Sequence, residues 1–192
     1  IVPGSDLTLL LVGVNPTRVG VLEILKLMGA DIELNNAREV GGEPVADIRV
    51  RYAPLKGIDV PEHLVPLAID EFPVLFVAAC CAEGVTRVTG AEELRVKESD
   101  RIQSMVDGLT TLGARIEGTP DGAIITGSGS GFRFQGGSVH AFEDHRIAMA
   151  LTVAGLRSTD TVSVHDCANV ATSFPNFVGL AREVGFPLSV VS

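Results

Sequence analysis

A loose internal repeat constrains this chain of 192 residues more than any other feature. Each copy consists of an amphipathic helical pattern, a glycine and a short run typical of a strand, and the three copies span residues 19–33, 101–117 and 177–188. In the middle copy the apolar side chains recur at helical spacing, which predicts a helix with one buried face. The glycine of each copy stands where a left-handed residue commonly ends a helix, at Gly29, Gly113 and Gly185. This repeat predicts a fold assembled from similar units of helix and strand.

Two further segments, residues 70–82 and 144–156, are apolar nearly all round. A helix without a polar face is buried on all sides, so both segments predict helices at the centre of the fold. The runs at 48–52 and 161–165 instead alternate polar and apolar residues, which is typical of strands with one face in water. The sequence therefore predicts an α/β fold in which the helices lie inside and the sheets lie outside.

The segments that follow the buried helices align with one another and with the start of the chain. Residues 82–88 and 156–164 each lead from a buried helix into a strand, and residues 1–9 have the same pattern. We therefore expect a buried helix, and a whole preceding lobe, before residue 1. On this register the chain is a C-terminal lobe, with a partial unit at 1–60, a complete unit at 61–140 and a closing unit at 141–192.

Composition and charge argue against several classes of function. The formal net charge is −9 and the pI is near 4.8, which disfavours nucleic acid as a partner because binding to phosphate backbones needs a basic face. The longest apolar stretch, residues 72–82, contains a proline and is about half as long as a membrane span. The three cysteines form neither a disulfide framework nor a metal-ligand spacing, so we expect no metal site and a reducing compartment, the cytoplasm.

Charged residues gather at the starts of three predicted helices, in residues 69–71, 93–101 and 143–146. Helix N-termini attract anions through their free N–H groups and their partial positive charge. The clusters add the cations Lys97, Arg101 and Arg146 and the carboxylates Asp70 and Glu98. Cations bind anions and paired carboxylates suit proton transfer, so the combination predicts a site for an anionic substrate with acid–base chemistry.

Taken one at a time, these residues also allow structural interpretations. Asp70 and Asp144 suit the N-cap position of the helices that follow them. Glu98 suits a solvated acid in the first turn of a helix. The two arginines could form structural salt bridges with neighbouring acids, Arg101 with Asp100 and Arg146 with Asp144. Only the gathering of both charge types at three helix starts favours a functional site.

Four short motifs follow one another along the chain, Ile-Asp-Glu-Phe-Pro at 69–73, Glu-Leu-Arg-Val-Lys-Glu-Ser-Asp-Arg at 93–101, Asp-His-Arg-Ile-Ala-Met-Ala at 144–150 and Thr-Ser-Phe-Pro at 172–175. Together they resemble the 5-enolpyruvylshikimate-3-phosphate synthase family. Glu93 and Thr172 stand where many glyphosate-sensitive members have asparagine and lysine, so the chain is more similar to the second, often glyphosate-tolerant, class. The resemblance implies an enzyme of two lobes, each an inside-out α/β barrel of βαβαββ units, with this chain as somewhat under half of it.

The resemblance also implies a reaction. The enolpyruvyl group of phosphoenolpyruvate passes to the 5-hydroxyl of shikimate 3-phosphate and phosphate is released, as part of chorismate and aromatic amino-acid biosynthesis, with no metal or organic cofactor. Asp70 matches the proton acceptor near the substrate hydroxyl, and Lys97 matches a lysine that reaches shikimate 3-phosphate and the reacting centre. Glu98 matches a glutamate that handles the methylene proton of phosphoenolpyruvate. Arg101 and Arg146 match arginines that bind phosphoenolpyruvate.

Two alternatives stay open at this point. The related transferase that acts on UDP-N-acetylglucosamine has the same fold, although Lys97, Glu98 and the motif at 144–146 favour the shikimate enzyme. A non-catalytic module derived from the same fold is the other alternative, although all five matched residues are present. Because the N-terminal lobe would supply the other wall of the site, we expect the isolated chain to be inactive.

Overall fold

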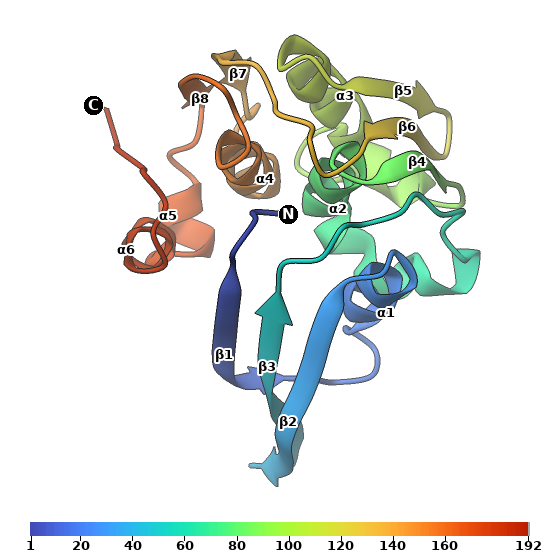
Figure 1. Cartoon of the computed structure of the whole chain (residues 1–192), viewed down its shortest axis with the longest axis vertical. Helices are drawn as coiled ribbons and strands as arrows, with labels where there is room; N and C mark the ends of the chain where they lie inside the picture. The colour runs from blue at the N-terminus through green and yellow to red at the C-terminus, as the bar shows by residue number, and fades with distance from the viewer. Residues whose placement is uncertain (192) are drawn as a thin grey trace.

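Two helices form the centre of the computed structural model, which describes residues 1–191. Helix α2 (Phe72–Cys80) and helix α4 (His145–Gly155) pack against one another in the interior, as Figure 1 shows. Every residue of α2 except Val74 is buried, which follows from the lack of a polar face. The two segments predicted as central helices are confirmed.

An antiparallel sheet covers α2, in the strand order β4 (Glu83–Val88), β6 (Gly122–Ser128) and β5 (Arg115–Thr119). Its inward side chains include Val88, Ala123 and Ile125, which are buried, while Arg87 and Glu117 face water. Helix α3 (Arg101–Thr111) packs between this sheet and the two central helices through one apolar face. Each element thus turns its apolar residues toward α2 and α4.

A second, parallel sheet is formed by β7 (Gly137–His140) and β8 (Val162–His165). Parallel neighbours need a crossover connection, and α4 supplies it. Val139 is buried against the helices, whereas His140 and His165 are exposed on the outer face. Buried helices with outward-facing sheets make this the inside-out α/β lobe that the sequence predicts.

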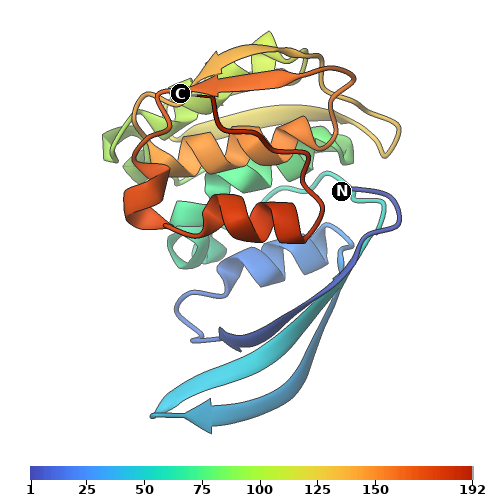
Figure 2. The ribbon, with the colours of Figure 1, turned by 90° about the vertical axis from the view of Figure 1, so that its left-hand side faces the viewer.

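The third sheet extends away from the helices, as Figures 1 and 2 show. Its antiparallel order is β1 (Asp6–Gly13), β3 (Glu43–Arg51) and β2 (Asp31–Val40), with α1 (Gly20–Leu27) at its base. Both outer strands bulge beside Asp47, β1 between Leu9 and Val12 and β2 between Asn35 and Arg38. The φ values are 56° at Leu11 and 52° at Asn36. The Asp47 carboxylate accepts hydrogen bonds from the Asn36 side chain (2.7 Å) and the Leu11 amide (2.9 Å). These bonds lower the pKa of Asp47 and hold the two bulges in place.

The three glycines predicted to end helices have positive φ values of 92°, 84° and 95°, at Gly29, Gly113 and Gly185. The strand expected after the last of them does not form. Helices α5 (Val170–Ser173) and α6 (Phe177–Glu183) are followed by residues 184–191 without helix or strand. Pro187 cannot donate to a sheet, and residues 186–191 have no strand partner within the described chain.

The helix starts also differ in detail from the sequence prediction. The helix expected from residue 70 begins at Phe72, because Pro73 is tolerated only in a first turn. Asp70 and Glu71 instead end the 3₁₀ helix η2 (Pro66–Glu71), which follows the short η1 (Glu62–Leu64). A third 3₁₀ helix, η3 (Glu92–Val96), precedes α3. Within residues 1–191 no helix is long and apolar enough to cross a membrane.

Candidate active site

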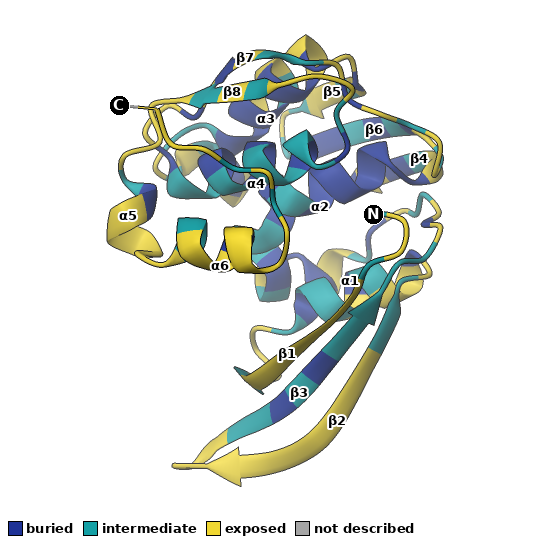
Figure 3. Ribbon diagram, turned by 60° about the vertical axis from the view of Figure 1, so that its left-hand side comes forward, coloured by how far each residue is buried: buried dark blue, intermediate teal, exposed yellow. Residues whose placement is uncertain are grey.

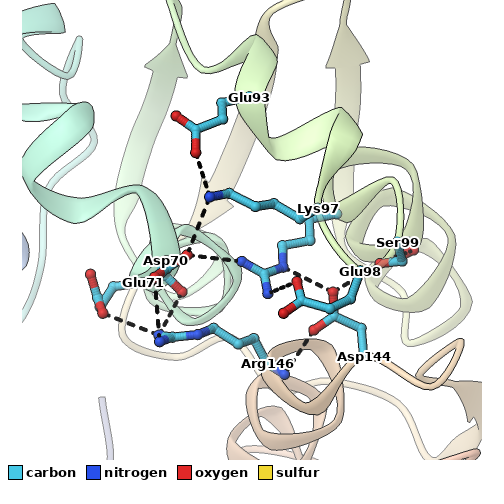
Figure 4. Close-up of polar contacts among 10 residues, drawn as sticks. Asp70, Glu71, Glu93, Lys97, Glu98, Ser99, Asp144 and Arg146 are labelled. Carbon is cyan, nitrogen blue, oxygen red and sulfur yellow. Dashed lines mark hydrogen bonds and ion pairs between the residues drawn. The ribbon is translucent and has the colours of Figure 1, made fainter.

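The starts of α2, α3 and α4 meet, and their charged side chains point toward one another (Figure 4). Asp70 comes from the end of η2, Lys97 and Glu98 from the turn between η3 and α3, and Arg146 from the first turn of α4. Although they lie far apart in the sequence, the fold brings together all five residues predicted for the site, namely Asp70, Lys97, Glu98, Arg101 and Arg146.

Arg101 lies at the centre of this charged cluster and is only 2% exposed. Its guanidinium donates to three carboxylates, from Nε to Asp144 at 2.9 Å, from Nη1 to Asp70 at 3.1 Å and from Nη2 to Glu98 at 2.5 Å. Burial alone would lower the pKa of Arg101, but the bonds to these carboxylates, above all to Asp144, outweigh it and raise that pKa. The cation is therefore permanent and its plane is fixed.

Asp144 is fully buried and uses both of its oxygens. One accepts from Arg101 Nε and from the Ser99 hydroxyl (3.1 Å), and the other accepts from the Arg146 amide at 2.9 Å, which caps α4. Burial would raise the pKa of Asp144, but the bonds to Arg101 and to the α4 amide outweigh burial and lower it. Asp144 is thus an anion at neutral pH.

Asp70 touches all three cations of the cluster. Its Oδ1 lies 3.1 Å from Arg101 Nη1 and 3.8 Å from Lys97 Nζ, and its Oδ2 lies 3.5 Å from Arg146 Nη2. Arg146 also donates to the Asp70 carbonyl (3.0 Å) and to Glu71 (3.1 Å), while Lys97 donates to the Glu93 carboxylate. The Asp70 carboxylate is about one-third exposed, so a ligand can reach it.

The cluster contains more negative than positive side chains, which affects how an anion can bind. The cluster holds five carboxylates (Asp70, Glu71, Glu93, Glu98 and Asp144) against three cations, and every cation already has carboxylate partners. An anionic ligand therefore competes with these carboxylates for the cations. Glu98 and Glu93 are roughly half exposed and can move, whereas Asp144 is buried and cannot.

The structural interpretations of single residues have mixed outcomes. Asp144 is an N-cap, as that interpretation predicts, but Asp70 is not, because α2 starts without a side-chain cap. The structural salt bridge considered between Arg101 and Asp100 does not form. Asp100 instead caps α3 by accepting from the Gln103 amide and pairs with Arg95 at 2.7 Å. The carboxylate group of Asp144 contacts Arg101 rather than the guanidinium of Arg146.

A hollow of about 160 Å³ opens beside the cluster and is lined by Asp70, Glu71, Pro73, Val74, Arg146, Met149, Ala150 and Val153. Both Asp70, whose carboxylate touches every cation, and Arg146, the more exposed of the two arginines, line this hollow. A second hollow of about 180 Å³ lies between α1, β3 and the central helices, and its lining is almost wholly apolar. Because the chemistry is at the cluster, the first hollow is the one that belongs to the site.

Sequence reasoning missed Glu71 and Glu93 as direct partners of the cations. Glu93 lies four residues before Lys97, a spacing typical of helical ion pairs, and that signal was available. Glu71 pairs with Arg146 across 75 residues of sequence, so no local spacing indicates it.

Thr172, which the sequence analysis compared with a lysine of other family members, lies on the exposed turn of α5.

The fold and the charged cluster define a lobe of the enolpyruvyl transferase type, and comparisons with known proteins agree with that class. A family model described as EPSP synthase (3-phosphoshikimate 1-carboxyvinyltransferase) matches residues 1–180. The chain belongs to this family.

Individual relatives show how much of the family's length is present. The 3-phosphoshikimate 1-carboxyvinyltransferases of Methylococcus capsulatus and Alkalilimnicola ehrlichii are 63% and 64% identical over 98% of this chain, which covers 42% of each. A solved EPSP synthase from Acinetobacter baumannii is 52% identical with a TM-score of 0.96, over 99% of this chain and 44% of that one. The chain thus spans less than half the length of the relatives it matches.

Proposed function

We propose that this chain is the C-terminal part of an EPSP synthase and forms one wall of its active site. The enzyme transfers the enolpyruvyl group of phosphoenolpyruvate to the 5-hydroxyl of shikimate 3-phosphate. The observation that carries this proposal is the contact of one accessible carboxylate, Asp70, with the three cations Lys97, Arg101 and Arg146.

The reaction needs three proton transfers, one at the acceptor hydroxyl and two at C3 of phosphoenolpyruvate. As the bond forms between the acceptor oxygen and C2 of phosphoenolpyruvate, a proton leaves the hydroxyl and another reaches C3. The bond from C2 to the phosphate oxygen then breaks, phosphate leaves, and a proton is lost from C3. We propose that Asp70 accepts the hydroxyl proton and that Glu98 transfers the protons at C3. The two carboxylates contact different nitrogens of Arg101, so each can serve a different atom of the substrates.

Substrate binding and the freeing of Glu98 are linked in this proposal. Glu98 occupies Arg101 Nη2 and is about half exposed, so a substrate carboxylate or phosphate can take its place with the same charge-assisted bonds. The displaced Glu98 takes up a proton from water, delivers it to C3 as the new C–O bond forms, and accepts the proton that C3 loses when phosphate leaves. Lys97 and Arg146 offset the negative charge that gathers in the tetrahedral intermediate.

The enzyme's compartment forms part of the same proposal. All three cysteines are free, Cys80 and Cys81 in the core and Cys167 at the surface. Burial raises the pKa of the Cys80 thiol, which makes it inert. Free thiols support a reducing compartment, and we place the enzyme in the cytoplasm.

The test uses the full-length enzyme, with Asp70→Asn and Arg146→Ala measured by phosphate release. The amide keeps the shape of Asp70 but cannot accept the proton, so kcat should fall about 10²- to 10⁴-fold. Loss of Arg146 should mainly raise KM for phosphoenolpyruvate. Asp59→Asn is the matched control, since Asp59 is exposed and pairs with Arg87 away from the cluster. Wild-type turnover in Asp70→Asn, or turnover with UDP-N-acetylglucosamine instead of shikimate 3-phosphate, overturns the proposal.

A further inference from the structure

Asp144 is the only buried carboxylate among residues 1–191, and its main partner, Arg101, is buried with it. The family resemblance gives Asp144 no role of its own. Its two oxygens join the start of α3 to the start of α4, since one binds the side chain of Arg101, 43 residues away, and the other binds the backbone of Arg146. Both of these arginines belong to the proposed substrate site.

We propose that Asp144 is a positioning residue, which holds the Arg101 guanidinium at Nε so that its two terminal nitrogens face the substrate. This inference rests on the proposed function of the site. Arginine has N–H donors on all three nitrogens, and the inner one is committed to Asp144. The outer two contact Asp70 and Glu98, which are both partly exposed and can exchange with a ligand.

The surroundings of Asp144 support a fixed rather than an exchangeable contact. The Ser99 hydroxyl donates to the same oxygen that binds Arg101, and Ser104 donates to Ser99 at 3.3 Å. With the α4 amide on the other oxygen, the carboxylate is held from three sides. A ligand can therefore displace Glu98 without releasing the guanidinium, and the binding geometry exists before the ligand arrives.

Asp144 could instead be needed only as the N-cap of α4. A substitution can separate capping from the positioning of Arg101. Serine caps helices about as well as aspartate, but a serine at this position is too short to reach Arg101. Asp144→Ser therefore keeps the cap and removes the contact with the guanidinium. Asp100→Ser is a matched control, because Asp100 caps α3 and pairs with Arg95, which lies outside the cluster.

The experiment compares the full-length enzyme with its Asp144→Ser, Asp100→Ser and Arg101→Lys variants in steady-state kinetics. We expect Asp144→Ser to raise KM for phosphoenolpyruvate at least about 10-fold and KM for shikimate 3-phosphate less than about 3-fold, with Asp100→Ser unchanged. In the Arg101→Lys background the Asp144→Ser change should add little, because its effect acts through that guanidinium.

The outcomes separate this inference from the proposed function. If Arg101→Lys raises KM for phosphoenolpyruvate but Asp144→Ser does not, the positioning role is wrong and the function stands. If Asp144→Ser raises both KM values in parallel with a fall in Tm, its role is only structural and the inference fails. If Arg101→Lys changes neither KM, the proposed function itself is contradicted. If Asp144→Ser does not fold, Ser99→Ala tests the inference instead. It removes the hydroxyl that donates to the Asp144 oxygen bound to Arg101, so it should raise only KM for phosphoenolpyruvate.

Discussion

The helices around the charged cluster are more deeply buried than the sheet of β1, β2 and β3, as the colours of Figure 3 show. In the helical region, Ile102, Leu109 and Leu151 are fully buried. In the sheet, Leu10 is 70% exposed and Leu11 57%. Apolar burial therefore stabilises the first region, whereas main-chain pairing and a small buried patch at Ala46 and Ile48 stabilise the second.

Exposed ion pairs add little to the sheet. Arg49 binds Asp6 and Arg51 binds Asp31, each at 2.7 Å, but these side chains lie at the surface, where water and salt weaken such pairs. The charged cluster lies wholly within the helical region. The cluster is thus placed on the more deeply buried part of the chain, so opening of the sheet should leave the cluster intact.

The largest expected effect is on stability. Leu109→Ala should lower the free energy of unfolding of the chain by about 2–5 kcal/mol, because it opens a cavity between α3 and the central helices. The matched change Leu10→Ala should alter it by less than about 0.5 kcal/mol, since that side chain is exposed in the sheet. Urea unfolding followed by circular dichroism measures both. Equal losses would remove the distinction between the two regions.

Hydrogen exchange should resolve the same difference within one molecule. We expect the isolated chain to fold, amides of residues 1–20 to exchange first, and the amides of α2 and α4 within residues 70–156 to stay protected. The reason is that β1 is exposed along nearly its whole length whereas α2 and α4 are enclosed. Uniform lack of protection across residues 70–156 contradicts the account.

The central helices were predictable because a helix that is apolar on every face is stable only in the interior of the fold. The helix-ending glycines were predictable because few other residues adopt positive φ. The strand after Gly185 was not, since strand formation depends on a partner that the local pattern does not specify. At the site, the sequence indicated which charges gather, but the pairing of Arg101 with Asp144 spans 43 residues and required the packing of α3 against α4.

A smaller effect concerns pH. The pKa of Asp144 is below its ordinary value of 3.8 in the folded chain, so its contribution to stability is present above about pH 3.8 and is lost as the pH falls through the lower folded pKa. Asp144→Asn should therefore differ from wild type most at pH 7 and converge with it in acid. Thermal unfolding across pH 2–7 measures this. In the sheet, Asp6→Asn should have a smaller effect, because its carboxylate is exposed. A constant difference between Asp144→Asn and wild type would contradict the pairing of Asp144 with Arg101.

Under the proposed function, this chain supplies one wall of a two-walled active site. The direct measurement is phosphate release from phosphoenolpyruvate and shikimate 3-phosphate by the purified chain, with and without the separately expressed N-terminal remainder of the enzyme. A single wall leaves the substrates unoriented and its cations screened by water, so we expect no turnover by the chain alone and turnover restored on mixing. The same mixture carrying Asp70→Asn should stay inactive. Steady turnover by the chain alone would contradict the claim.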